Sequence, residues 1–144
     1  MYMSYKGRFK PKHYNKYKGD PTKIIYRSLW ERRFMKYCDD NPNILKWSSE
    51  EVIIPYRMDD GSLHRYFPDF MIEYRDKDGN MQREIIEVKP KKQCSPPVRG
   101  KKSYGRYIAE VKTYRKNECK WDAAREYCVD RGYKFRILTE DHLT

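Results

Sequence analysis

The chain has 144 residues, of which 15% are aromatic, and carries a formal net charge of +11. This length suits one domain with a real core, the aromatic content argues against a disordered chain, and the charge points to a polyanionic partner, nucleic acid before anionic membrane. The sequence contains no apolar run near the ~20 residues of a membrane span and no apolar signal-peptide core, so no membrane insertion is expected.

Residues 1–22 are predicted to form a basic, aromatic arm that precedes a domain over residues 23–144. Basic and aromatic side chains are interleaved through residues 1–19, which contain no acid. Basic residues supply phosphate contacts and aromatic residues supply stacking surfaces, as a DNA- or RNA-tracking arm requires. The alternative is an arm that is solvated or docks on a protein partner.

Aromatic residues at helical spacing predict a helix over residues 28–39, ended by Asn41-Pro42. Glu31, in the first turn of this helix, has two possible roles. With Ser28 it completes a capping box worth about 1 kcal/mol. Alternatively, Glu31 projects toward the following strands as a third carboxylate, and the residues themselves leave both roles open.

Strands are predicted over residues 44–47 and 52–56, and the turn formers at 59–61 lead from them into a central hairpin within residues 67–92. If residues 76–80 form its loop, paired positions sum to 156, and Asp69 lies opposite Glu87. A register shifted by one residue would set Asp69 beside an apolar side chain.

Two carboxylates that face each other at ~5 Å repel, and proteins usually tolerate this only with a cation between them. The spacing therefore predicts a metal site formed by Asp69 and Glu87, with the backbone carbonyl of Val88 as a further ligand. Mg2+ in this site, with Mn2+ as a substitute, would activate water and neutralise a phosphodiester. Lys89, on the same strand face, could orient or deprotonate the attacking water.

A basic loop follows Lys89 and contains no acid before Glu110. Basic charge beside an acidic metal pair suits a phosphodiester substrate, whereas the alternative is ordinary solvated loop charge. The predicted DNA-binding residues are Lys91, Lys92, Arg99, Lys101, Lys102 and Arg106.

The remaining chain is predicted as a helix over residues 107–116, a second helix capped by Asn117 and ended by Gly132, and a strand over residues 133–138. This order of elements predicts a mixed α/β domain whose small sheet is flanked by helices.

Phe67-Pro68-Asp69 and Ile86-Glu87-Val88-Lys89, with a helical Glu upstream, together resemble the PD-(D/E)xK nuclease superfamily. Tyr26-Arg27-Ser28-x-x-Glu31 and Lys120-Trp121-x-Ala123-Ala124 resemble its TnsA-like endonuclease branch, and nearly the whole chain resembles the head-completion nucleases of tailed bacteriophages. The resemblance implies an α/β, restriction-endonuclease-like core of a helix, a three-stranded hairpin sheet, helices and a strand. It also implies four catalytic residues, Glu31, Asp69, Glu87 and Lys89.

The same resemblance implies a metal-dependent DNA endonuclease, with exonuclease activity as a further capability, that acts on double-stranded DNA before heads and tails join. It places the protein in the host cytoplasm during assembly or in the neck of the virion, with portal or connector proteins as partners. One alternative is a structural neck protein that keeps the fold and binds DNA without cutting, and the intact set of two acids and a lysine argues against it. Another alternative is an RNA-binding or RNA-cutting protein.

Overall fold

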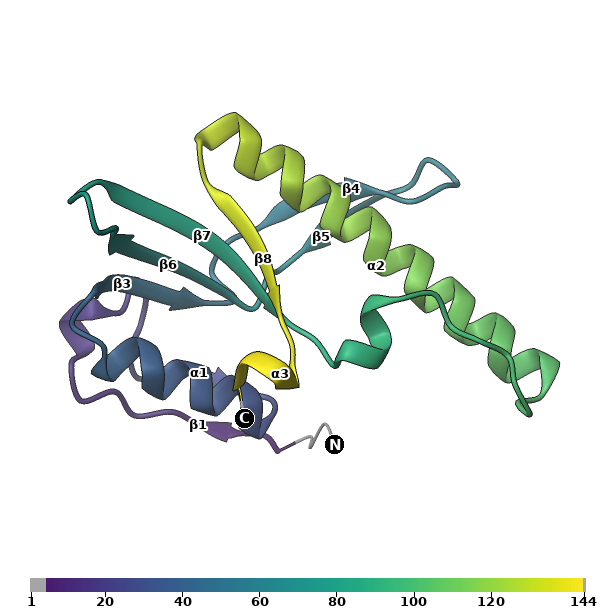
Figure 1. Cartoon of the computed structure of the whole chain (residues 1–144), viewed down its shortest axis with the longest axis horizontal. Helices are drawn as coiled ribbons and strands as arrows, with labels where there is room; N and C mark the ends of the chain where they lie inside the picture. Colours follow the sequence, from purple (N-terminus) through teal and green to yellow (C-terminus); the bar gives the residue numbers. More distant parts are fainter. Residues whose placement is uncertain (1–4, 144) are drawn as a thin grey trace.

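A four-stranded sheet, in the order β3-β6-β7-β8, forms the centre of the computed structural model, which describes residues 5–143 (Figure 1). The strands β3 (Ile44–Ser49), β6 (Phe70–Arg75) and β7 (Met81–Val88) are antiparallel neighbours, and β8 (Lys134–Leu138) joins β7 in parallel. Helices lie beside this sheet, which confirms the predicted α/β class.

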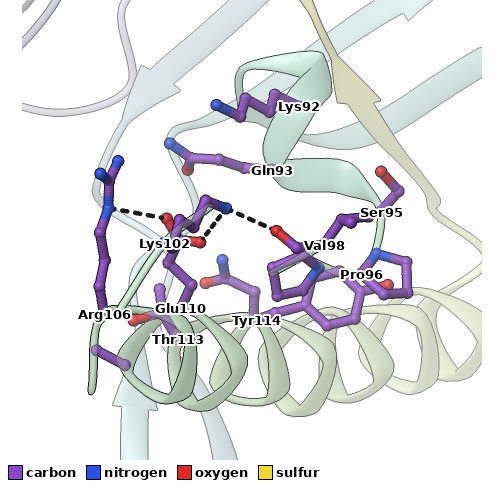
Figure 2. Close-up of a pocket in the computed structure, with 13 residues that line it drawn as sticks. Lys92, Gln93, Ser95, Pro96, Val98, Lys102, Arg106, Glu110, Thr113 and Tyr114 are labelled. Atoms are coloured by element: carbon purple, nitrogen blue, oxygen red, sulfur yellow. Dashed lines mark hydrogen bonds and ion pairs between the residues drawn. The ribbon is translucent and has the colours of Figure 1, made fainter. Parts of the chain in front are cut away.

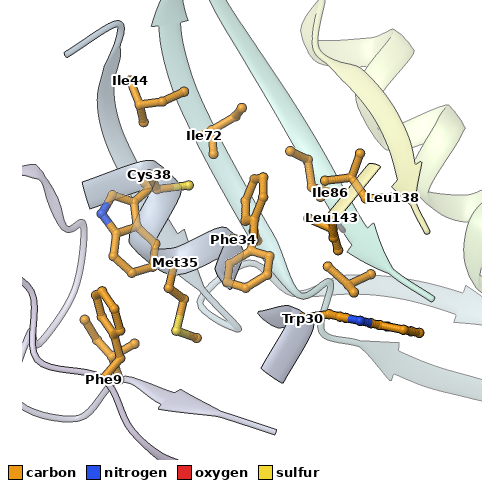
Figure 3. Close-up of a cluster of buried hydrophobic side chains, with 14 of the residues drawn as sticks. Phe9, Trp30, Phe34, Met35, Cys38, Ile44, Ile72, Ile86, Leu138 and Leu143 are labelled. Carbon is orange, nitrogen blue, oxygen red and sulfur yellow. The ribbon is translucent and has the colours of Figure 1, made fainter. Parts of the chain in front are cut away.

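Helix α1 (Leu29–Asp40) covers one face of the sheet. Its Phe34 packs against Phe70 with ring centroids 4.8 Å apart, in a buried cluster that also contains Ile72 and Ile86 (Figure 3). The short C-terminal helix α3 (Glu140–Leu143) closes this cluster with Leu143. Helix α1 begins one residue later than predicted, because Ser28 is its N-cap.

Helix α2 (Tyr104–Arg131) packs Trp121 and Ala124 against Met71 and Ile85 on the other face. The central strands are therefore apolar on both faces, as buried strands require. None of the described helices is long and apolar enough to cross a membrane.

The prediction that α2 would be two helices was wrong. The helix runs without a break for 28 residues, and Asn117 is buried in its interior instead of capping a second helix. Asn is only a mild helix disfavourer, and packing on the sheet overrides that preference. Gly132 ends the helix as predicted, with φ of +72° and an N–H that donates to Cys128 and Val129.

The register of the central hairpin is confirmed. Phe70 pairs with Ile86 and Arg75 with Met81, so paired positions sum to 156. The loop of residues 76–80 is closed by a 2.9 Å hydrogen bond from the Asp76 N–H to the Asn80 carbonyl.

Residues 59–61 do not lead directly into this hairpin, which corrects the predicted chain path. They form the turn of a separate two-stranded hairpin, β4 (Ile54–Arg57) with β5 (Leu63–Tyr66). Strand β5 gave no apolar signal because three of its four side chains are exposed. Tyr66, at its end, is buried and returns the chain toward the central sheet.

The described part of the predicted arm packs on the α1 face. Strand β1 (Gly7–Arg8) pairs with β2 (Ile25–Tyr26), and a 3-10 turn, η1 (Tyr14–Lys16), lies between them. Phe9 and Tyr17 are buried, with ring centroids 5.9 and 4.8 Å from that of Trp47, a residue with no solvent exposure. The division at residue 22 stays a prediction, and residues 1–4, with Tyr2, and Thr144 lie outside the described residues.

Asp39, at the end of α1, ties this segment to the body. Its carboxylate accepts hydrogen bonds from the Lys12 N–H (2.8 Å) and the His13 N–H (3.0 Å), and the residue is 2% exposed. The Lys16 ammonium donates to three carbonyls at the same helix end, those of Cys38, Asp39 and Asn41. These bonds satisfy groups that a helix C-terminus otherwise leaves open.

We expect Asp39→Ala to lower the free energy of unfolding by about 1–3 kcal/mol, because it leaves two backbone N–H groups without their acceptor. Urea unfolding measures this loss, and limited proteolysis should cut first within residues 5–22. Asp40→Ala, at the neighbouring exposed position, is the matched control. Equal stability of the two variants would contradict this role of Asp39.

Candidate active site

Asp69 and Glu87 lie together where β6 begins and β7 ends. The Asp69 N–H donates to Glu87 Oε1 (3.4 Å), while Asp69 Oδ2 accepts from the Val88 N–H (2.7 Å). The two carboxylates that the register places opposite each other therefore share backbone contacts across the strands.

Pro68 explains why the strand pairing stops at this point. In the register of the hairpin Val88 falls opposite Pro68, which is fully buried and has no N–H to donate. Since the N–H and C=O of one residue point to the same side of a strand, the Val88 carbonyl faces the Asp69 side without a ladder donor. A backbone oxygen is thereby left open beside the two carboxylates.

Lys89 and Tyr66 both contact Glu87. The Lys89 ammonium lies 3.8 Å from Glu87 Oε2, and the Lys89 N–H donates to the Leu138 carbonyl (2.9 Å), which fixes the lysine backbone on β8. The Tyr66 hydroxyl donates to Glu87 Oε1 at 2.7 Å. Glu87 is thus held by a cation on one oxygen and by two donors on the other.

Glu31 serves the start of α1. Its N–H donates to Ser28 Oγ (3.1 Å), and its Oε1 accepts from the Arg27 N–H (3.2 Å), so the capping arrangement forms with Arg27 as the reciprocal donor. Glu31 is nonetheless only 6% exposed, and its charge raises the pKa of the Asp69 carboxyl. The capping role is confirmed, and the role of Glu31 as a third carboxylate of the site stays a prediction.

The acids of this site are electrostatically strained. Burial, and then the charges of Glu87 and Glu31, hold the pKa of Asp69 well above its ordinary value. Burial likewise raises the pKa of Glu87, against the opposing effect of Lys89, and it raises that of Glu31. Such an arrangement gains stability from any cation that neutralises it.

These residues fit a hard divalent cation. Asp69 Oδ1, Glu87 Oε2 and the Val88 carbonyl are oxygen donors of the kind that Mg2+ prefers, and Mg2+ takes its other ligands from water or phosphate. Among residues 5–143, no three His, Cys, Asp or Glu side chains are placed so as to hold a metal by themselves. A cation bound here would need the backbone carbonyl and ligands from outside the protein in addition to the two carboxylates.

The basic loop after Lys89 is partly engaged within the protein. It contains the 3-10 turn η2 (Lys91–Cys94) and arches over α2 around a cavity of about 640 Å³ (Figure 2). The Lys102 ammonium contacts Glu110 and donates to the Val98 carbonyl, and Arg106 lies 3.8 Å from Glu110.

Of the other predicted DNA contacts, the Lys91 ammonium lies 3.0 Å from Asp141, and Arg99 lies over the ring of Tyr104. Lys92 and Lys101 are exposed, without an ion pair to the described residues. Several of these cations therefore hold the loop in place within the protein.

Three residues near the site gave no individual signal in the sequence. Glu50 has φ of +57°, donates its N–H to the Asp69 carbonyl and accepts from Arg27 Nε (3.1 Å). Tyr66 belongs to the strand that the sequence did not reveal. The Lys120 ammonium of α2 lies 5.6 Å from the centre of the Tyr66 ring, and its charge lowers the pKa of Glu87. Lys120 belongs to a recognised motif, but no periodicity pointed it toward the carboxylates.

Comparisons with known proteins agree with this geometry. Residues 41–140 match a family model described as TnsA-like endonuclease N terminal, and this range includes Asp69, Glu87 and Lys89. The chain is 44% identical, over 149 aligned residues, to the head completion nuclease of Enterobacteria phage T4, covering 98% of this chain and 95% of that protein. No solved structure gives a significant match.

We expect Asp69→Asn to raise the melting temperature of the metal-free protein at pH 7.5. A carboxyl whose pKa is raised in the folded state binds more protons there than in the unfolded state. Its contribution to stability therefore falls as the pH rises from its ordinary pKa to the raised pKa of the folded state. The isosteric amide removes that repulsion and still accepts from the Val88 N–H. The melting temperature of the wild type should rise when the pH is lowered from 7.5 to 5.5, and that of the variant should rise less.

Asp76→Asn is a control that should change stability in the opposite direction. Hydrogen bonds from Gln82 and from the loop backbone lower the pKa of Asp76, so its charge is favourable at neutral pH. Its substitution should reduce stability at pH 7.5. If both variants lost stability, Asp69 would be an ordinary structural carboxylate.

Proposed function

The chain belongs to the TnsA-like endonuclease family, and from this membership we propose that it is a divalent-metal-dependent DNA endonuclease of phage head completion. The observation that carries the proposal is the Asp69–Glu87 pair, with Lys89 on the same strand face. The name of the T4 relative supports both the nuclease activity and the place in head completion.

Asp69, Glu87 and the Val88 carbonyl would hold Mg2+, or Mn2+ in its place. A divalent cation at this position supplies charge neutralisation for the phosphoryl oxygens and a more acidic bound water. Lys89 reaches over Glu87 Oε2 and is placed to orient the attacking water or to accept its proton. Glu31, held by Ser28 and Arg27, adds negative charge that favours the cation and orients its water ligands.

The substrate in this proposal is double-stranded DNA, cut internally and with exonuclease action as a further capability. The exposed Lys92 and Lys101, together with Lys91, Arg99, Lys102 and Arg106, would contact phosphates of the substrate along the loop that follows Lys89. The protein would act in the host cytoplasm during assembly, or in the neck of the virion, with portal or connector proteins as partners. Those partners would bind surfaces other than the carboxylate end of the sheet.

We expect the purified protein to nick supercoiled plasmid in Mg2+ or Mn2+ but not in EDTA. Asp69→Ala in Mg2+ should cut no faster than the wild type does in EDTA. The reason is that this variant removes one of the two carboxylate ligands. Agarose gels measure the nicking, and Asp78→Ala, in the distant β6–β7 loop, is the matched control. Tight DNA binding without cutting in any divalent cation would overturn the nuclease proposal and favour a structural neck protein.

Lys89→Ala should lower the rate of nicking by about 10²–10⁴-fold, since a positioned proton acceptor or water-orienting group contributes that much. Metal affinity, measured by calorimetry, and DNA affinity should stay near those of wild type, because Asp69 and Glu87 remain. Full activity in this variant would remove Lys89 from the mechanism. Parallel reactions on RNA of the same sequence test the choice of DNA.

A further inference from the structure

The cations of α2 fall into two groups with different surroundings. Its arginines are engaged within the protein: Arg106 with Glu110, Arg115 with Asp59 and Glu118, Arg125 with Asp122, and Arg131 with the ring of Tyr127. Its lysines, Lys112, Lys116 and Lys120, form no ion pair with any carboxylate of residues 5–143. Apart from Arg131, which lies over an aromatic ring, the cations of α2 without a carboxylate partner among the described residues are therefore its lysines.

These three lysines lie in one row. They are four residues apart, so on a helix of 3.6 residues per turn they follow a single slanting ridge and rise about 6 Å from each to the next. Lys112 and Lys116 are exposed, and Lys120 is half-buried. Their backbone positions span about 12 Å along the axis, enough for several phosphates at about 3.4 Å of axial spacing per DNA strand.

The row ends at the candidate active site. The Lys120 ammonium lies over the Tyr66 ring at 5.6 Å, and the hydroxyl of this ring donates to Glu87 Oε1 at 2.7 Å. The aromatic face holds the cation without neutralising it. Burial lowers the pKa of Lys120, and the charge of Lys116 lowers it further, so the two ammonium groups repel each other until an anion approaches.

The surrounding α2 surface leaves room for a DNA strand. Gly105, Ala109 and Thr113 occupy the turns beside the row with small side chains. On one flank the loop of residues 90–103 is held by Lys102 and Glu110 (Figure 2), and on the other Arg115 and Asp59 hold the β4–β5 hairpin to the helix. α2 extends beyond the sheet between these two elements (Figure 1).

We infer that Lys112, Lys116 and Lys120 form a phosphate track that leads one DNA strand along α2 to the paired carboxylates. This inference rests on the proposed function and specifies which surface receives the strand. Lys112 and Lys116 contact phosphates beyond the cleaved bond and contribute affinity. Lys120 contacts the phosphate nearest Asp69 and Glu87, where positive charge also counters the charge that develops during cleavage.

The first test measures binding apart from cleavage. The anisotropy of a labelled DNA duplex in EDTA gives the dissociation constant between 50 and 200 mM salt. In Lys112→Gln/Lys116→Gln the slope of log K against log salt should decrease in magnitude by about 2, since each lost phosphate contact removes about 0.9. Lys36→Gln, an exposed lysine on α1 across the sheet, should keep the wild-type slope. An unchanged slope in the double variant would overturn the track.

The second test concerns Lys120 in Mg2+. Lys120→Gln should lower kcat for nicking by about 10²-fold, as the loss of one charge-stabilising donor does, and Lys120→Arg should recover much of it. Equal rates for wild type and Lys120→Gln would remove Lys120 from the track.

The two proposals fail separately. If wild type nicks plasmid but the double variant keeps the wild-type slope, the track is wrong and the nuclease stands. If wild type never nicks but the slope decreases as expected, the track stands as a DNA-binding surface and the nuclease is wrong.

Discussion

The structure depends on holding Asp69 and Glu87 side by side although their charges repel and burial disfavours both. Donors on separate elements contact the two carboxylates and hold them in place: the Val88 N–H on β7, the Tyr66 hydroxyl on β5 and the Lys89 ammonium after β7. None of these donors neutralises the pair, since the pKa values of both acids remain raised. The fold therefore maintains a concentration of negative charge that is costly alone and favourable around a cation. A site of this kind is expected to trade stability for function.

The N-terminal segment helps to fix the site by holding α1 in place. Phe9 and Tyr17 close the cluster around Trp47, and Asp39 and Lys16 fasten the far end of the helix. The helix start, with Glu31, is thereby held at the end of the sheet where the carboxylates lie. Among the aromatic residues predicted to stack on nucleic acid, Phe9 and Tyr17 are core residues. Composition alone could not separate these uses, because an aromatic side chain packs on a core or a base by the same physics.

The sequence predicted best what short-range geometry determines. The five-residue loop set the register of the central hairpin, and the register alone brought Asp69 opposite Glu87. It failed where tertiary contacts decide: β5 has little apolar patterning, yet it pairs with β4, and Asn117 stays inside a helix because the sheet covers it. Lys120 was missed for the same reason, since its place beside Tyr66 follows from the packing of α2 on a hairpin that local patterns do not reveal.

The cations of this chain, whose net charge is +11, include two groups with different roles, the arginines and the lysines of α2. Arg115 binds both carboxylate oxygens of Asp59 at 2.8 Å, and this fork holds the β4–β5 hairpin, and with it Tyr66, against α2. Arginine suits such fixed, planar pairing, whereas the lysine ammonium is a hydrated point charge that adapts to a moving phosphate backbone. On α2 the arginines build the frame and the lysines remain unpaired on a ridge that ends at the site. An arginine that pairs with a carboxylate adds nothing to the net charge, because the acid cancels it, so the unpaired lysines of the second group contribute directly to the attraction of DNA.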